Sequence, residues 1–266
     1  MFARSALRAL IGVVVVATPL FAQTALGPYA PVTAKYRITS RTSTAQTMMG
    51  QAQEFESTTN QLMSMSVAKS GDALALTMVL DSATISSTAP DGAPGLSEAI
   101  GLKFAGTMAL DGKVASSQVT DKLGAPSTSQ FAGNMRSILP RLQLGASTGA
   151  TWVDSSTSTT KQNDADVTTA TVVTHTLAGD TSVAGIKAWK IVAASAGQVS
   201  GAGNRMGADY SIAGDVKGLS TSLVSVTGIL LGITSDTVTN LVVTVESAGM
   251  TIPILQKSTT IIEKLP

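Results

Sequence analysis

The residues that could do chemistry are few, and the most informative of them is the single histidine, His175. A Ser-His-Asp triad needs an imidazole as its general base, and a metal site built on imidazoles needs several of them. His175 lies inside the alternating stretch "DVTTATVVTHTL", which is typical of a β-strand. Ser195, in "AASAG", lacks the first glycine of the G-x-S-x-G nucleophile motif. We therefore interpret His175 as a structural residue and Ser195 as a hydroxyl at a strand end.

Two further patterns resemble functional motifs without completing them. The segment "GAGNRMG" at 201–207 has the spacing G-x-G-x-x-x-G, which differs from a dinucleotide fingerprint, and no helical pattern follows it. We interpret it as a turn between strands. Glu54 and Glu56 lie two residues apart on one strand face, where both carboxylates are expected to face water instead of forming an acid–base pair.

Candidate metal ligands are equally sparse. Asn163, Asp164 and Asp166 offer oxygen atoms to Ca²⁺ but lack the glycine and the distal glutamate of an EF-hand loop. The absence of cysteine excludes disulfides, thiolate nucleophiles, Cys-ligated zinc and a lipobox cysteine. The sequence therefore predicts no cofactor, no metal site and no enzymatic activity. A hydrolase that uses Ser195 or His175 is a disfavoured alternative.

The charge balance argues against a nucleic-acid partner. The 266 residues include 18 Lys and Arg and 17 Asp and Glu, for a net charge of +1, whereas phosphate binding needs a concentrated basic face. Only 13% of the residues are charged, so much of the polar surface must come from Ser and Thr. Thr and Val favour β-strands, and the length suffices for one large β domain or two smaller ones.

The first residues have the pattern of a secretory signal peptide. Arg4 and Arg8 form a positive region, 10–17 form a short apolar region, Pro19 ends it, and cleavage is expected after Ala22. An uncleaved anchor is the alternative, although the apolar run is shorter than the roughly 20 residues that span a bilayer. We expect a periplasmic or secreted protein.

Alternation of apolar and polar residues predicts long strands through most of the mature chain. In "DALALTMVLDSATI", residues 72–85, the Leu and Met side chains fall on one face. Turn signals at 70–72 and at 111–112 separate such runs. The segment 219–233 also fits a helix, and we assign it to a strand for its Ser, Thr and Val content. Pro253 cannot donate to a ladder, so its strand is expected to be an edge strand or to bulge there.

A change of period predicts one short α-helix at about 127–144. Phe131, Met135 and Leu142 recur at helical spacing, and Pro140 limits the regular helix. The predicted fold is thus mainly β: one large curved antiparallel sheet, or half-barrel, with this single helix. Residues 23–266 are expected to form one β-rich domain, and a weak internal similarity suggests two related halves, 33–126 and 145–266.

The predicted sheet has a wide apolar face and few large side chains to cover it. Met is adaptable and frequent at permissive binding surfaces, so this face could bind an apolar ligand; it could equally be filled by the chain's own core. The candidate lining residues are Phe55, Met63, Met65, Leu74, Leu76, Met78, Leu80, Leu102, Phe104, Met108 and Leu110.

Several segments together resemble a known group of proteins. They are "GDALALTMVLDSATI", "LKFAGTMALDGKV", "ILPRLQLGASTGATW" and "THTLAG…GIKAWKI", within residues 33–264, with a Pro140…Gly145…Trp152 spacing. Their order resembles an uncharacterised family of secreted or lipid-anchored bacterial proteins and, more remotely, periplasmic lipoprotein-carrier-like half-barrels. The resemblance implies a curved antiparallel sheet around an apolar cavity lined by a helix, and no catalytic residue. Many of these proteins are lipoproteins, and this chain lacks the anchoring cysteine.

These observations predict an exported, non-enzymatic protein that binds an apolar ligand or a lipid acyl chain on the concave face of its sheet. Peripheral association with the cell envelope is compatible with this prediction. The alternative is a structural or interaction protein of the cell envelope with a dry core.

Overall fold

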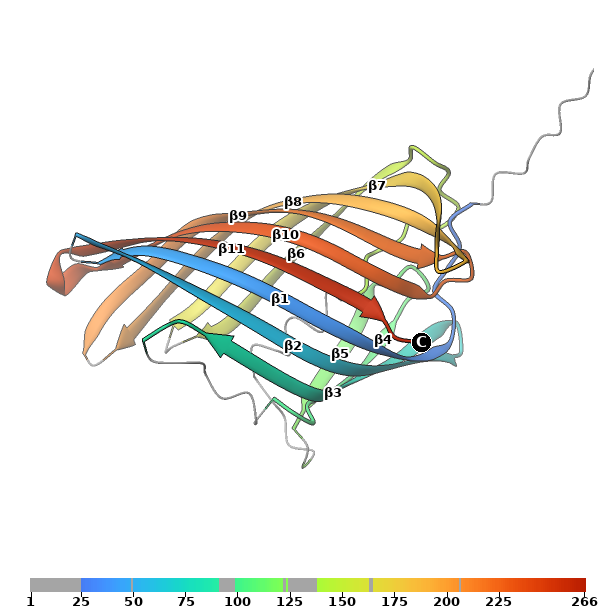
Figure 1. The fold of residues 1–266 in the computed structure, drawn as a ribbon, viewed down its shortest axis with the longest axis horizontal. Helices are drawn as coiled ribbons and strands as arrows, with labels where there is room; N and C mark the ends of the chain where they lie inside the picture. Colours follow the sequence, from blue (N-terminus) through green and yellow to red (C-terminus); the bar gives the residue numbers. More distant parts are fainter. Residues whose placement is uncertain are drawn as a thin grey trace, which may run out of the picture.

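A single long antiparallel sheet dominates the structure (Figure 1). The computed structural model describes residues 25–48, 50–90, 99–121, 123, 138–162, 165–205 and 207–266, so the predicted signal segment 1–22 lies outside the described residues. The strands are β1 (Val32–Met48), β2 (Gln51–Ser70), β3 (Ala73–Ser87), β4 (Lys103–Met108), β5 (Val114–Thr120), β6 (Thr151–Gln162), β7 (Ala165–Val183), β8 (Ile186–Arg205), β9 (Ala208–Ser225), β10 (Leu230–Val245) and β11 (Met250–Lys264).

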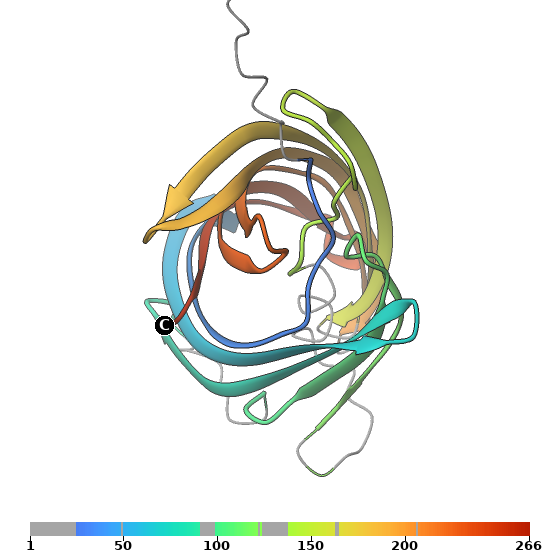
Figure 2. The same cartoon turned by 90° about the vertical axis from the view of Figure 1, so that its right-hand side faces the viewer.

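The strands form an up-and-down meander in which sequence neighbours pair, except that β5 and β6 are not paired in the described part of the chain. Its order is β5-β4-β3-β2-β1-β11-β10-β9-β8-β7-β6, so the first strand pairs with the last and β5 and β6 are the two edges. Viewed from one end, the 11-stranded sheet rolls around an interior (Figure 2). It is not closed into a barrel, because no ladder joins β5 to β6 among the described residues. The prediction of one large curved antiparallel sheet is confirmed.

Turns form where the local sequence contains glycine and aspartate turn residues. The predicted turns at 70–72 and 111–112 join β2 to β3 and β4 to β5. The segment 219–233, predicted as one strand, is instead divided by a turn between β9 and β10. Gly228 in that turn has φ +82, a left-handed conformation that glycine adopts without strain. A Cβ at this position would collide with the backbone of Pro28, so the turn packs closely against the N-terminal segment.

The predicted helix at 127–144 is not supported. Its described part, 138–144, consists of bends, turns and coil, and residues 127–137 lie outside the described residues. Pro140 has no N–H to give to a helix, and its ring disfavours helical backbone before it, which outweighs the helical spacing of the apolar residues. Within the described residues the only helical element is the 3₁₀ turn η1 (Glu246–Ala248). No helix in that part of the chain has the length and apolar character needed to cross a membrane.

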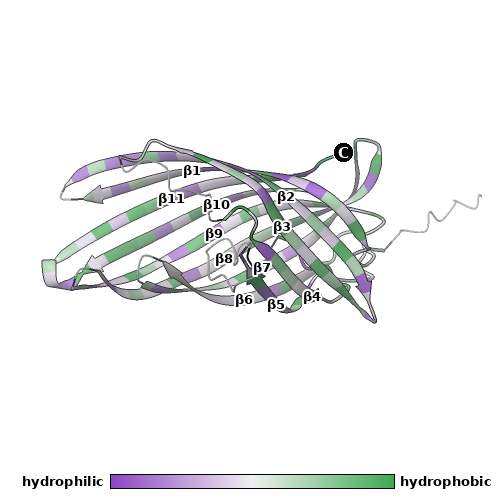
Figure 3. Ribbon diagram, turned by 90° about the horizontal axis from the view of Figure 1, so that it is seen from below, coloured by the Kyte–Doolittle hydropathy of each residue, from purple (hydrophilic) through white to green (hydrophobic). Residues whose placement is uncertain are grey.

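The inner face of the sheet changes character along its length. At the end where β9 turns into β10, which we call the closed end, a large apolar core fills the interior. At the opposite end, where the β1–β2 and β10–β11 hairpins turn, the inward side chains are mostly half-buried; we call this the open end. Figure 3 shows apolar and polar residues alternating along the strands. The expected division into the halves 33–126 and 145–266 stays a prediction, and the described strands of both ranges join in the one sheet.

Candidate functional site

The residues predicted to line a ligand site lie mainly in the core of the closed end. Leu110 is 39% exposed in the turn after β4, and Phe55 is half-buried nearer the open end. The others are at most 2% exposed and belong to the main core cluster: Met63, Met65, Leu74, Leu76, Met78, Leu80, Leu102, Phe104 and Met108.

The chain's own connecting segments pack against this apolar wall. Leu26, Tyr29 and Leu142, which lie before β1 and between β5 and β6, are buried in the same core. The Tyr29 hydroxyl donates to the carbonyl of Pro140 at 2.7 Å, and the Leu26 amide donates to Ala146 at 2.9 Å. Because these segments occupy the concave face here, ligand binding by the predicted residues stays a prediction.

A charged cluster holds the seam, which we define as the gap between the edge strands β5 and β6. Arg141 donates from Nη1 to Asp154 of β6 at 2.9 Å and from Nε to Asp111 of the β4–β5 turn at 3.3 Å. The hydrogen bond to Asp154, and after it the one to Asp111, raises the pKa of Arg141 against the opposing effect of burial. A cavity of about 390 Å³ lies here and is lined by both Arg141 and Asp111. Since both carboxylates already neutralise the guanidinium, this cavity is a poor site for an anion.

His175 is part of the packing beside the seam. Its ring stacks on Trp152 with centroids 5.3 Å apart and planes 12° apart, and the Trp152 indole N–H donates to the carbonyl of Arg141 at 3.0 Å. His175 is 6% exposed, and its Nδ1 has no hydrogen-bond partner in the described structure. Burial lowers the pKa of His175, and the nearby Asp154 offsets part of this effect. The neutral imidazole therefore suits this position.

The other sequence candidates are not brought together. Ser195 is half-buried on β8 and pairs with Val173, whereas His175 pairs with Ala193 in the same ladder. Glu54 and Glu56 are both exposed on β2.

Candidate metal and nucleotide ligands are also scattered. Gly201 to Arg205 belong to β8, so the glycine-rich segment 201–207 is largely strand and not only a turn. Asp166 is exposed, and Asn163 and Asp164 lie outside the described residues. No group of three metal-ligating side chains occurs among the described residues.

The middle of the inner face carries hydroxyl groups instead of apolar side chains. Ladder register places them on the same face as Tyr36 of the core, and all are half-buried. Two cross-strand pairs are hydrogen-bonded, Ser40 with Thr260 at 2.9 Å and Thr42 with Ser258 at 3.1 Å. We call this set the hydroxyl band: Ser40, Thr42, Ser57, Thr59, Ser220, Ser235, Thr237, Thr239, Ser258 and Thr260.

Beyond the hydroxyl band, a second apolar cluster lies toward the open end. It contains three buried residues with four partly buried ones packed against them, all on β7 to β10. The four partly buried side chains, Tyr210, Ile212, Val216 and Leu241, keep contact with solvent. We call these residues the open-end cluster: Ala165, Val167, Val199, Tyr210, Ile212, Val216 and Leu241.

A cavity of about 530 Å³, which we call the rim pocket, adjoins this cluster where two hairpins separate. The β1–β11 ladder ends at Gln46 and Ile254, so Pro253 has a strand neighbour only on the β10 side. The expectation of an edge strand or a bulge is wrong, because β11 is an inner strand with a regular ladder to β10; Pro253 fits there because it lies beyond the end of the β1 ladder. Inward side chains such as Gln46 and Leu241 and outward ones such as Val242 line the same cavity, which therefore cuts through the wall of the sheet.

Sequence reasoning missed both the hydroxyl band and the rim pocket. The signal for the band was present, because Ser40 and Thr42 continue the parity of Tyr36 and Ile38 along β1. The pocket depends on where β1 and β11 cease to pair, and those strands are separated by nearly the whole chain.

Comparisons with known proteins give only weak likenesses. No protein-family model matches the chain, and neither does any curated protein. A DUF1329 family protein from Desulfovibrio piger aligns at 13% identity over 86% of this chain and 83% of its own, with a TM-score of 0.24. OmpF of Salmonella typhi, in complex with daunomycin, aligns at 8% identity over 89% and 100%, with a TM-score of 0.27.

A third solved structure is a domain from Vibrio parahaemolyticus described as an outer membrane lipoprotein-sorting protein. It aligns at 9% identity over 86% of this chain and 83% of its own, with a TM-score of 0.20. Alignments this weak say nothing about what the chain binds.

Proposed function

We propose that the protein is an exported, non-enzymatic binding protein that takes up an apolar or amphiphilic molecule, such as an acyl chain, on its concave face. The site is the open-end cluster together with the rim pocket. Export follows from the signal-peptide pattern of residues 1–22.

The observation that carries the proposal is the accessible apolar cluster beside a pocket of suitable size. Small-molecule sites are typically concave, largely apolar and about 300–1,000 Å³ in volume, and the rim pocket measures about 530 Å³. Leu241 belongs to both the pocket lining and the cluster. Because four members of the cluster are only partly buried, a guest can replace the water that contacts them.

The proposal includes no catalytic step. The single histidine, His175, stacks on Trp152 beside the seam and pairs in its ladder with Ala193 instead of a residue that could act as a nucleophile. The open-end cluster consists of side chains without titratable groups except for Tyr210.

A structural or interaction role in the cell envelope is the second candidate, and the packing of the closed end favours it. There the Leu and Met wall is covered by the chain's own segments, as in a protein that uses its core only for stability. The two candidates differ in whether the open end takes up a ligand.

Uptake of N-phenyl-1-naphthylamine, an uncharged apolar probe whose fluorescence rises in apolar surroundings, tests the proposal. We expect the wild-type protein to bind the probe and Leu241→Glu to lose most of that binding, because a carboxylate would enter the apolar cluster. Val238→Glu is the matched control, since Val238 is 38% exposed on the outer face of the same strand. Equal uptake by both variants, or no uptake by the wild type and a ligand-free mass in native mass spectrometry, would overturn the proposal.

A further inference from the structure

We infer that the site selects electrically neutral amphiphiles whose head group carries hydroxyls, and that it discriminates against fatty acids and other charged lipids. The inference deepens the proposed function and rests on it. It depends on the kinds of side chain that line the inner face between the closed-end core and the open end.

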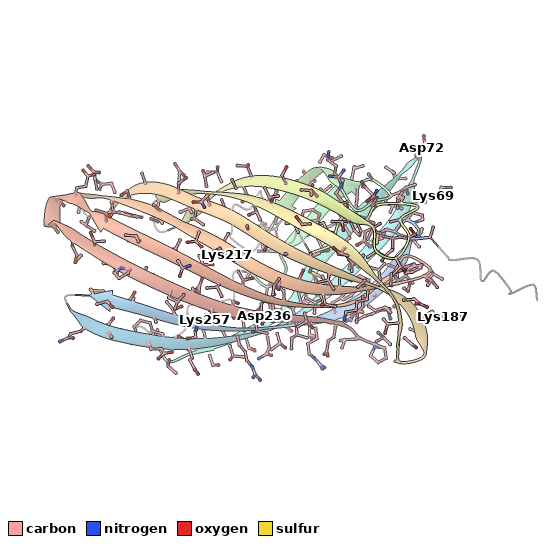
Figure 4. The ribbon with its side chains drawn as sticks, turned by 90° about the horizontal axis from the view of Figure 1, so that it is seen from above. Lys69, Asp72, Lys187, Lys217, Asp236 and Lys257 are labelled. Carbon is pink, nitrogen blue, oxygen red and sulfur yellow. The ribbon has the colours of Figure 1, made fainter. Side chains whose placement is uncertain are left out.

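Charged side chains in this region point to the other face of the strands, and one of them, the exposed Glu54, also lines the rim pocket. Lys217, Asp236 and Lys257 lie on neighbouring strands of the outer surface (Figure 4). Asp236 accepts a hydrogen bond there from Thr259 at 2.6 Å. On the inner face of β1, β2 and β7 to β11, the described side chains level with Thr42 or nearer the open end are hydroxyl, amide, apolar or glycine, and none is charged.

The nearest charged group on the inner face already forms an ion pair within the protein. Asp154 of β6, which ladder register places level with Thr237, is bound to Arg141 at the seam. A ligand carboxylate or ammonium placed in the hydroxyl band would therefore lose hydration without gaining a counter-ion. Such a transfer costs far more than the transfer of a neutral hydroxyl that finds a hydrogen-bond partner.

The hydroxyl band offers the partners that a neutral polar head group needs. Each Ser or Thr hydroxyl can donate one hydrogen bond and accept two, so the pairs Ser40–Thr260 and Thr42–Ser258 keep unused capacity. Thr237 lies in register with Ser258, in the middle of the band. The band thus lies directly beside the apolar cluster, as an amphiphile with a hydroxylated head and an acyl tail requires.

Displacement of N-phenyl-1-naphthylamine by three ligands with the same acyl length tests the inference. They are monolaurin, dodecanoate and dodecylammonium, each below its micellar concentration at about pH 8, where both ions are charged. We expect monolaurin to displace the probe at a concentration about tenfold or more below that of either ion, a factor that corresponds to about 1.4 kcal/mol.

A charge placed on the inner face should change the preference. Thr237→Lys should bind dodecanoate better than monolaurin, because the ammonium supplies the missing counter-ion. Val238→Lys, with the same charge on the outer face, should keep the wild-type order. Thr239→Lys, one inward position nearer the open end, replaces Thr237→Lys if that variant does not fold, and the wild-type comparison needs neither.

The outcomes separate this inference from the proposed function. Probe binding with equal displacement by all three ligands overturns the inference and leaves the proposed function intact. Absence of probe binding by the wild type overturns the proposed function and the inference with it. An unchanged preference in a folded Thr237→Lys or Thr239→Lys protein shows that the hydroxyl band does not contact the head group, and also overturns the inference.

Discussion

At the scale of single residues, the stacked pair of His175 and Trp152 shows how the only imidazole of the chain is used. The ring is 6% exposed and lies beside Asp154 and Arg141, yet its Nδ1 has no partner in the described structure. A neutral ring packs well against the indole, whereas an imidazolium would be buried with only partial compensation from Asp154. The residue that suggested catalysis thus contributes packing.

This burial predicts a specific pH dependence of stability. The pKa of His175 is lowered in the folded protein and returns to about 6.5 in the unfolded chain. Below about pH 6.5 the unfolded chain therefore binds a proton that the folded protein binds less readily, so stability falls as the pH falls. Between about pH 7.5 and 5.5 we expect the Tm of the wild type to decrease and the Tm of His175→Gln to change less. Parallel Tm profiles of the two proteins would contradict this assignment.

Gly214 on β9 shows why some inward positions carry no side chain at all. A Cβ there would collide with the carbonyl oxygen of Asn240 and lie 2.9 Å from the Cα of Leu241. We expect Gly214→Ala to lower the free energy of unfolding by about 1–3 kcal/mol, as other overpacked substitutions do. Gly27→Ala is the control, since its new Cβ would meet its nearest atom at 4.0 Å. Urea unfolding of both variants measures the difference, and similar values for the two would refute the predicted collision.

At the scale of elements, the segment between β5 and β6 joins the two edges that the sheet leaves unpaired. Arg141 reaches both Asp111 and Asp154, and the amide of Leu142 donates to the carbonyl of Asp111 at 2.7 Å. The segment therefore replaces, at the closed end, the ladder that a closed barrel would have there.

Removal of the guanidinium should loosen this junction. We expect Arg141→Met to lower the free energy of unfolding by about 1 kcal/mol, because two partly buried ion pairs are lost and two carboxylates are left without a counter-charge. Arg41→Met on the outer face of β1 should change it by less than about 0.5 kcal/mol. Equal effects of the two substitutions in chemical denaturation would show that the ion pairs at the seam do not contribute.

The elements that could be predicted are those whose signal is local. Strand parity in 72–85 and the turn at 111–112 are visible in a few residues and are confirmed. The helix at 127–144 was wrong in its described part because Pro140, which was expected only to limit the helix, leaves no helix around it. The turn within 219–233 was missed because the close approach of Gly228 to Pro28 joins distant parts of the chain.

At the scale of the whole molecule, the interior has a packed end and an accessible end. The same strands contribute to both: β1 places Tyr36 in the core and Thr44 near the rim pocket. The Tyr36 hydroxyl donates to the carbonyl of Leu230 at 2.9 Å, and burial raises the pKa of Tyr36. The closed end is thus fixed by both apolar packing and buried hydrogen bonds.

This asymmetry should appear in hydrogen exchange. We expect peptides of β1 and β11 that contain Tyr36 or Ile262 to exchange at least about tenfold more slowly than peptides around Thr44 or Ile254, because opening the closed end exposes the buried core. Exchange measured by mass spectrometry on the intact protein checks this expectation. Uniform protection along both strands would mean that the sheet opens only as a unit.

The candidate site could be predicted only in part. The alternation of apolar and polar residues identified the apolar face and its row of Leu and Met side chains. Alternation alone does not say which segment of the chain covers that face. Residues near Leu26 and Leu142 cover that row, whereas the accessible apolar residues near Leu241 lie in the second half of the chain. Distinguishing the two ends requires knowing that β1 pairs with β11.

That pairing also constrains biosynthesis. Tyr36 faces Lys264, and β1 can gain its second neighbour only when the last strand has left the ribosome. Until then the nascent chain consists of two separate meanders. Each meander has an exposed apolar face and an edge strand whose backbone N–H and C=O groups are unpaired. Folding should therefore be slow and post-translational, and a chain that ends before Met250, and so lacks the whole of the 15-residue β11, should aggregate instead of maturing.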